Sequence, residues 1–136
     1  MKILIDNGHG KETPGKRSPD GSIQEWQYTR SIAKIVVNTL KGYGYDAELL
    51  APEEHDVKLD ERVARVNRWC DKLGPKNVLM VAIHVNAAKN SGWGNGYGWS
   101  AYTTIGRTNS DRLAESLYDE AKAAFAGRKI RQASGE

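Results

Sequence analysis

Residues 3–11, ILIDNGHGK, join a run of aliphatic side chains to a histidine in a glycine-rich stretch. The segment Lys2 to Asp6 predicts a short buried strand, and His9 follows soon after its end. A second, nearly continuous apolar run, VLMVAIHV at 78–85, predicts a central strand covered on both faces, with His84 near its end. Two histidines that are far apart in the sequence are therefore predicted to follow two buried strands.

The rest of the chain alternates between helical and extended patterns. Apolar residues at helical spacing predict helices at 22–41, 57–73 and 109–126. Two further strands are predicted at 45–52 and around 99–104. This alternation predicts an α/β fold, a single domain over residues 1–136 with a mainly parallel sheet flanked by helices on both faces.

The apolar residues of each predicted helix form one stripe that is expected to face the sheet. The three stripes are Tyr28, Ile32, Ile35, Val36 and Leu40 in the first helix, Leu59, Val63, Val66, Cys70 and Leu73 in the second, and Leu113, Leu117, Tyr118, Ala121 and Phe125 in the third.

Composition excludes several classes of protein. The chain has 136 residues and a single cysteine, Cys70, so it forms neither an intrachain disulfide nor a cysteine-based zinc cluster. Its net charge of +3 suits an anionic partner such as a wall polymer. The chain has no basic tract interleaved with aromatic residues, the pattern that would favour nucleic-acid binding. No apolar run could span a bilayer and no secretory signal precedes the first strand. We therefore expect a monomer, cytoplasmic as synthesised, without membrane insertion or nucleic-acid binding.

The two predicted strand ends place His9 and His84 at the same edge of a parallel sheet, where ligands usually bind. Two imidazoles and one carboxylate form a catalytic zinc set that leaves a position open. Glu25 is the preferred carboxylate, because the first helix begins at that edge. Asp6 would instead orient one of the metal ligands without binding the metal itself. Glu12 lies in a stretch too rich in glycine and proline for its position to be predicted.

Each of these residues also has a plainer interpretation. His9 could be an ordinary loop residue, and His84 could be a hydrogen-bonded histidine of the core. Glu25 could complete a capping box with Ser22 in the sequence SIQE. His55, among acidic neighbours, is expected to be solvated and is left out of the site. Residue pattern alone leaves the metal site and these alternatives open.

Four motifs occur in a characteristic order: ILIDNGHG, EWQYTRSIAKIVVNTLKGYGYDAELL, DERVARVN and VAIHVNAA. Together they resemble the zinc-dependent N-acetylmuramoyl-L-alanine amidases of the Amidase_3 type, from Met1 to about Phe125. The resemblance implies that His9, Glu25 and His84 bind Zn²⁺. It also implies that the partner is peptidoglycan, cleaved at the amide between N-acetylmuramic acid and L-alanine. Asn86 would then donate a hydrogen bond to the substrate, or else cap the strand end.

The sequence departs from the family pattern in one respect. Family members carry a further glutamate on a late strand, which serves as general acid or base. No residue of this chain is assigned that role. The last residue, Glu136, follows RQASG and not an apolar strand. We therefore expect a chain truncated at its C-terminal end, lacking the last strand of the sheet; the alternative is that this edge strand is absent and that activity is impaired. The alternatives are a zinc-containing wall-binding module without activity, or another zinc peptidase on a related fold.

Two further expectations concern the setting of the protein. The lack of a signal resembles the lytic enzymes of phages and prophages, the endolysins, which reach the wall after release from the cytoplasm. The aromatic residues Trp93, Tyr97 and Trp99 either stack on sugar rings or pack against the sheet edge, and packing is the preferred interpretation.

Overall fold

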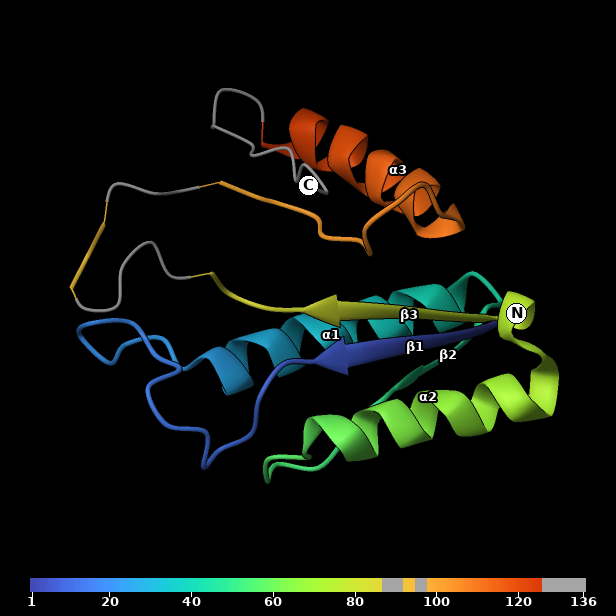
Figure 1. Ribbon diagram of the computed structural model, residues 1–136. Helices are drawn as coiled ribbons and strands as arrows, with labels where there is room; N and C mark the ends of the chain where they lie inside the picture. The colour runs from blue at the N-terminus through green and yellow to red at the C-terminus, as the bar shows by residue number, and fades with distance from the viewer. Residues whose placement is uncertain (87–91, 95–97, 126–136) are drawn as a thin grey trace. The chain divides into compact units, whose positions relative to one another are not determined.

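The computed structural model describes residues 1–86, 92–94 and 98–125 (Figure 1). The elements in chain order are β1 (Lys2–Asn7), α1 (Glu25–Gly42), β2 (Asp46–Leu49), α2 (Leu59–Leu73), a short 3-10 helix η1 (Pro75–Asn77), β3 (Val78–Ile83) and α3 (Asn109–Ala124). The chain divides into two compact units; the sheet, α1 and α2 belong to the first and α3 to the second. None of these described helices has both the length and the apolar character needed to cross a membrane.

The three described strands form one parallel sheet in the order β2-β1-β3. Lys2 at the start of β1 pairs with Asp46 on one side and with Val78 on the other, so the three strands begin level. All six residues of β1 are buried. The predicted parallel α/β architecture is confirmed, with β1 at the centre.

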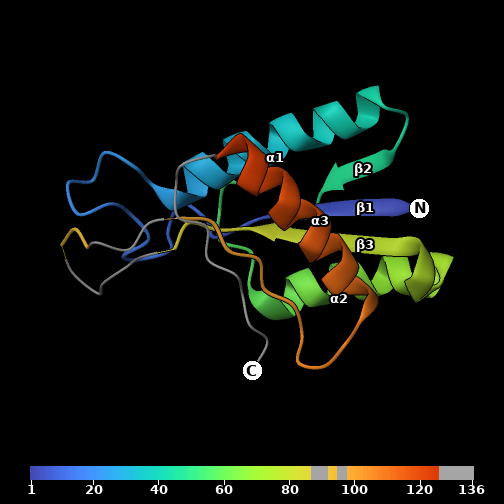
Figure 2. The same ribbon diagram turned by 90° about the horizontal axis from the view of Figure 1, so that it is seen from above.

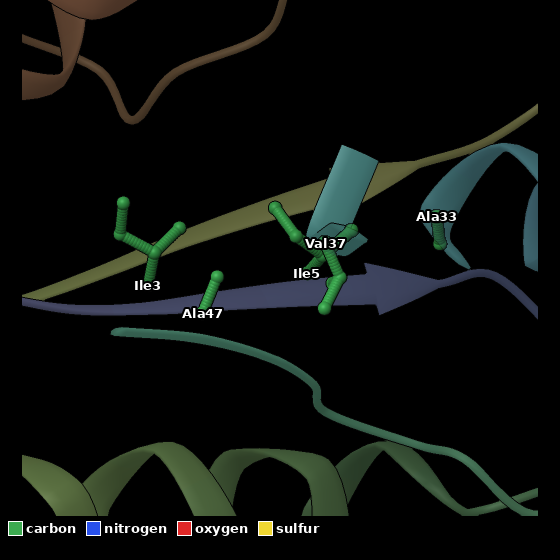
Figure 3. Close-up of a cluster of buried hydrophobic side chains, with 5 residues drawn as sticks. All are labelled: Ile3, Ile5, Ala33, Val37 and Ala47. Atoms are coloured by element: carbon green, nitrogen blue, oxygen red, sulfur yellow. The ribbon is translucent and has the colours of Figure 1, made fainter. Parts of the chain in front are cut away.

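Helices α1 and α2 cover opposite faces of the sheet (Figure 2). On the α1 face, one buried apolar cluster joins β1, β2 and α1 (Figure 3). Its members are Ile3, Ile5, Ala33, Val37 and Ala47. On the other face, the Lys2 ammonium lies 4.3 Å from the centre of the Trp69 ring of α2. Helices on both faces of the sheet were predicted, and this prediction is confirmed.

The prediction that residues 78–85 form a central strand covered on both faces is wrong. In the described part of the sheet β3 is an edge strand, Met80 is 46% exposed, and the strand ends at Ile83. A continuous apolar run indicates that a strand is hydrophobic but does not indicate its position in the sheet. The sequence therefore could not show which of β1 and β3 is the central strand.

The strand predicted around 99–104 is also absent, since described residues 98–104 have irregular backbone. Strand formation depends on a ladder partner more than on β-propensity, and the sequence supplied only the propensity. In the same unit, the ring of Trp99 lies 6.2 Å from that of Tyr118 of α3. Trp93 is 65% exposed, and Tyr97 lies outside the described residues.

The predicted inward stripes of α1 and α2 are partly wrong. Tyr28 and Ile35 of α1 are more than half exposed, whereas Thr29, a neighbour on the helix, is fully buried. In α2, Leu59 is 76% exposed and the only buried residue is Arg62. Ala33 of α1 is buried in the apolar cluster with β1 and β2, and Arg62 of α2 is buried in an ion pair with Asp6 of β1.

Candidate metal centre

The carboxyl ends of β1 and β3 and the first turn of α1 meet at one edge of the sheet (Figure 1). His9 follows β1, His84 follows β3, and Glu25 is the first residue of α1. One ligand atom from each of these three side chains lies within 4.8 Å of the other two. The structure therefore brings together the three residues that the sequence selected.

The Glu25 carboxylate is at the centre of this group. Its Oε1 atom lies 3.4 Å from His9 Nε2 and 3.2 Å from His84 Nδ1, and it accepts a hydrogen bond from the Val85 N–H at 2.9 Å. Glu25 is 6% exposed, and the two imidazole rings are edge to face with centres 5.0 Å apart. A buried carboxylate between two imidazoles is a donor set suited to a divalent cation.

The glycines on either side of His9 are required by close contacts. A Cβ atom on Gly8 would lie 2.5 Å from the His84 ring, and one on Gly10 would lie 2.2 Å from the backbone nitrogen of Asp56. His9 itself has a φ of 62°, the left-handed conformation that costs a non-glycine residue about 1 kcal/mol or more. The sequence GHG thus holds a strained histidine between two positions without room for a side chain.

The position of Glu25 excludes the capping-box interpretation. Helix α1 begins at Glu25 with Gln24 as its N-cap, and no side chain caps it. The Ser22 hydroxyl donates instead to Asp20. Glu25 is therefore one position past the cap, where its charge interacts favourably with the helix dipole, and its carboxylate is turned inward. The Thr29 hydroxyl, within hydrogen-bond distance of the carbonyls of Glu25 and Gly8, links the helix to the β1 turn.

Burial lowers the pKa of His9 below its usual value, and electrostatic interactions with His84 and Lys16 act in the same direction. The Glu25 carboxylate opposes this effect without cancelling it. A lower pKa favours the neutral imidazole, the form that binds a metal ion.

Arg62 supports the turn that carries His9, and the sequence reasoning missed it. Its guanidinium forms a buried ion pair with Asp6. It also donates to the carbonyls of Val57 at 2.7 Å, Asn7 at 3.0 Å and His9 at 3.5 Å. Asp6 therefore acts on the His9 turn through Arg62. The available signal was the position of Arg62, which lies three residues after Leu59 and four before Val66 and so falls within the predicted apolar stripe of the helix.

The turn after β1 and the turn after β2 are joined by two hydrogen bonds. The Lys11 N–H donates to the Glu54 carbonyl at 2.8 Å, and the Asp56 N–H donates to the Glu12 carboxylate at 3.0 Å. Glu12 is thus a structural residue of this junction. His55, in the same turn, is exposed as predicted.

We expect Arg62→Met to lower the free energy of unfolding by about 3–5 kcal/mol, because it leaves the Asp6 carboxylate buried without a partner. The double variant Asp6→Leu, Arg62→Met should recover much of this stability, since no unpaired charge remains. Urea unfolding measures both effects, with Arg68→Met on the exposed face of α2 as the control. Equal destabilisation by Arg62→Met and Arg68→Met would contradict the assigned role.

The Arg65–Glu53 pair predicts a pH dependence of stability. Arg65 binds both carboxylate oxygens of Glu53, at 2.7 and 2.9 Å, and this hydrogen bonding lowers the pKa of Glu53 from 4.5 to about 2. The folded state therefore gains stability from this pair above about pH 4.5 and loses it as the pH falls toward 2. Glu53→Gln should flatten the acid limb of the stability curve in that window. A curve that keeps its slope there would assign the acid dependence to other groups.

The sheet is parallel, and two imidazoles and one carboxylate lie together at its carboxyl edge. The chain is therefore an α/β protein with a candidate metal centre of two histidines and one carboxylate. Residues 3–135 match the family described as N-acetylmuramoyl-L-alanine amidase, Amidase_3, and the chain belongs to this family. The resemblance found in the sequence motifs is confirmed.

Individual relatives agree with this assignment. The chain is 34% identical over 109 residues to N-acetylmuramoyl-L-alanine amidase AmiC of Neisseria meningitidis serogroup B, a match that covers 79% of this chain and 24% of that protein. The chain thus spans about a quarter of the length of this relative.

Two solved structures have the same fold. The catalytic domain of CwlV, an N-acetylmuramoyl-L-alanine amidase from Bacillus (Paenibacillus) polymyxa var. colistinus, superimposes with a TM-score of 0.70 at 23% identity, covering 98% of this chain and 70% of that one. N-acetylmuramoyl-L-alanine amidase AmiC2 of Nostoc punctiforme gives a TM-score of 0.72 at 22% identity, with coverages of 97% and 67%.

Proposed function

We propose that this chain forms the catalytic domain of a zinc-dependent hydrolase that cleaves the amide between N-acetylmuramic acid and L-alanine in bacterial peptidoglycan. The observation that carries the proposal is the convergence of His9, Glu25 and His84 at the sheet edge of an Amidase_3 family member. The same proposal makes peptidoglycan the partner and the cell wall the place of action.

Zinc fits this donor set because its preferred ligands are imidazole nitrogen and carboxylate oxygen, and three protein ligands leave a position open for chemistry. Glu25 would supply the charge that two neutral imidazoles lack. The chemistry that zinc supplies when bound in such a set is polarisation of the amide carbonyl and activation of water.

Contacts made by other residues of the chain hold this arrangement in place. Gly8 leaves room for the His84 ring, and the Arg62 guanidinium bonds the backbone on both sides of Gly8. The Val85 N–H fixes one oxygen of Glu25. Asn86, exposed just beyond these residues, is proposed to donate a hydrogen bond to the bound substrate.

The decisive experiment measures zinc content and peptide release from purified sacculi. We expect about one zinc ion per chain, as in other sites with this ligand set, and loss of release when a chelator removes it. Adding zinc back should restore release. His55→Ala, which removes the exposed third histidine, is the matched control and should keep both zinc and activity. Sedimentation with the wall without peptide release, in the zinc-loaded chain, would favour a wall-binding module instead.

A further inference from the structure

The loop between β1 and α1, residues 8–24, lies at the same edge of the sheet as the three candidate ligands (Figure 1). Its second half is fixed to the start of α1. The Glu25 N–H donates to the Lys16 carbonyl at 2.9 Å, and Arg17 pairs with Gln24 in an antiparallel bridge. Lys16 and Arg17 are therefore held against the residue that carries the central carboxylate of the site.

The two acidic side chains of this loop, Asp20 and Glu12, accept hydrogen bonds from uncharged donors. Asp20 accepts from the Ser18 hydroxyl at 2.6 Å and from the Ser22 hydroxyl at 2.8 Å. These bonds keep the pKa of Asp20 at about 2. Glu12 accepts from the Asp56 N–H. Neither carboxylate is used to neutralise the positive charges of the loop.

Lys16 and Arg17 are both exposed, and within the described residues neither forms an ion pair with a carboxylate. The Lys16 carbonyl accepts its hydrogen bond from Glu25, the central residue of the candidate metal centre. The loop thus presents two cations beside the candidate metal centre, on a backbone fixed by hydrogen bonds. A fixed backbone reduces the conformational entropy that the loop loses when an anion binds.

We propose that Lys16 and Arg17 form a carboxylate-binding subsite for the peptide stem of the substrate, next to the scissile amide. The inference rests on the proposed function, because that function places a peptide beside this loop. Stem peptides carry free carboxylates unless these are amidated, and a guanidinium with a neighbouring ammonium suits a carboxylate ligand. The subsite would make the enzyme prefer free-acid stems over amidated stems.

The test compares two product peptides, L-alanyl-D-isoglutamyl-L-lysine and its isoglutamine counterpart, which differ by one carboxylate. Calorimetry with the zinc-loaded chain should show that the free acid binds about tenfold more tightly than the amidated peptide. This is the scale of two partly exposed ion pairs. Lys16→Gln, Arg17→Gln should abolish this preference by weakening only the free acid. Lys34→Gln, Lys41→Gln removes the same charge from exposed positions further along α1 and should leave the preference unchanged.

Cleavage of the matching muramoyl peptides provides the second measurement, in which the double variant should raise KM for the free acid and leave kcat unchanged. Equal affinity of the unaltered chain for the two peptides would overturn the proposal. So would an equal loss on both peptides in the double variant, which would indicate that the two cations bind a group common to both peptides and not the carboxylate that differs between them. If the chain binds with the expected preference but does not cleave, the proposed function fails while this subsite stands.

Discussion

Glu25→Ala is expected to weaken zinc binding by more than about 100-fold, beyond the 10- to 100-fold loss typical of supporting residues. The substitution removes the one charged ligand and leaves two neutral imidazoles, which bind a divalent cation far less strongly. His9→Ala and His84→Ala should each cause a comparable loss. Release of peptide from sacculi should fall with zinc content in all three variants.

The matched comparison for this prediction is Glu25→Gln, which keeps the shape of the side chain and an oxygen for the Val85 N–H. It should retain the fold, as judged by circular dichroism, while losing zinc. Metal analysis after dialysis against a weak chelator gives the measurement. Full zinc content in Glu25→Ala would show that this carboxylate is structural and would remove the basis for the metal centre.

Gly10→Ala is expected to destabilise the fold by about 3 kcal/mol or more, at the upper end for overpacking. The added methyl group would lie 2.2 Å from the Asp56 nitrogen and 2.3 Å from its Cα. Backbone atoms cannot turn aside as a flexible side chain can, so the turns after β1 and β2 would have to separate. Because the turn after β1 carries His9, zinc affinity should fall together with the free energy of unfolding.

Gly42→Ala is the control for this substitution, because a Cβ there meets no atom within 4 Å and the position ends α1. It should be neutral or slightly stabilising, as alanine favours helix over glycine. Urea unfolding of both variants measures the difference. A Gly10→Ala chain within about 0.5 kcal/mol of the unaltered protein, the scale of an inconsequential surface change, would show that the two turns are not in contact as described.

The grouping of His9, Glu25 and His84 at one edge of the sheet could be predicted because local sequence marks where a chain leaves a sheet. His9 and His84 each follow an apolar run, and parallel strands bring such ends to one edge. Glu25 could be selected from the expected start of the helix, although the helix begins three residues later than the prediction at Ser22. The capping box suggested by the same residues was wrong, because a cap depends on backbone angles that the sequence does not report.

The sequence by itself determined the alternation of elements, the parallel α/β class and the chemical character of the candidate metal centre. Only the tertiary structure decided that β1 is central among the three described strands, that Arg62 bonds the His9 turn, and that Gly10 touches the loop at Asp56. The physical reason is the range of the interactions involved. Periodicity and turn chemistry act over a few neighbouring residues, whereas Arg62 and His9 are 53 positions apart and meet only through the packing of α2 on the sheet.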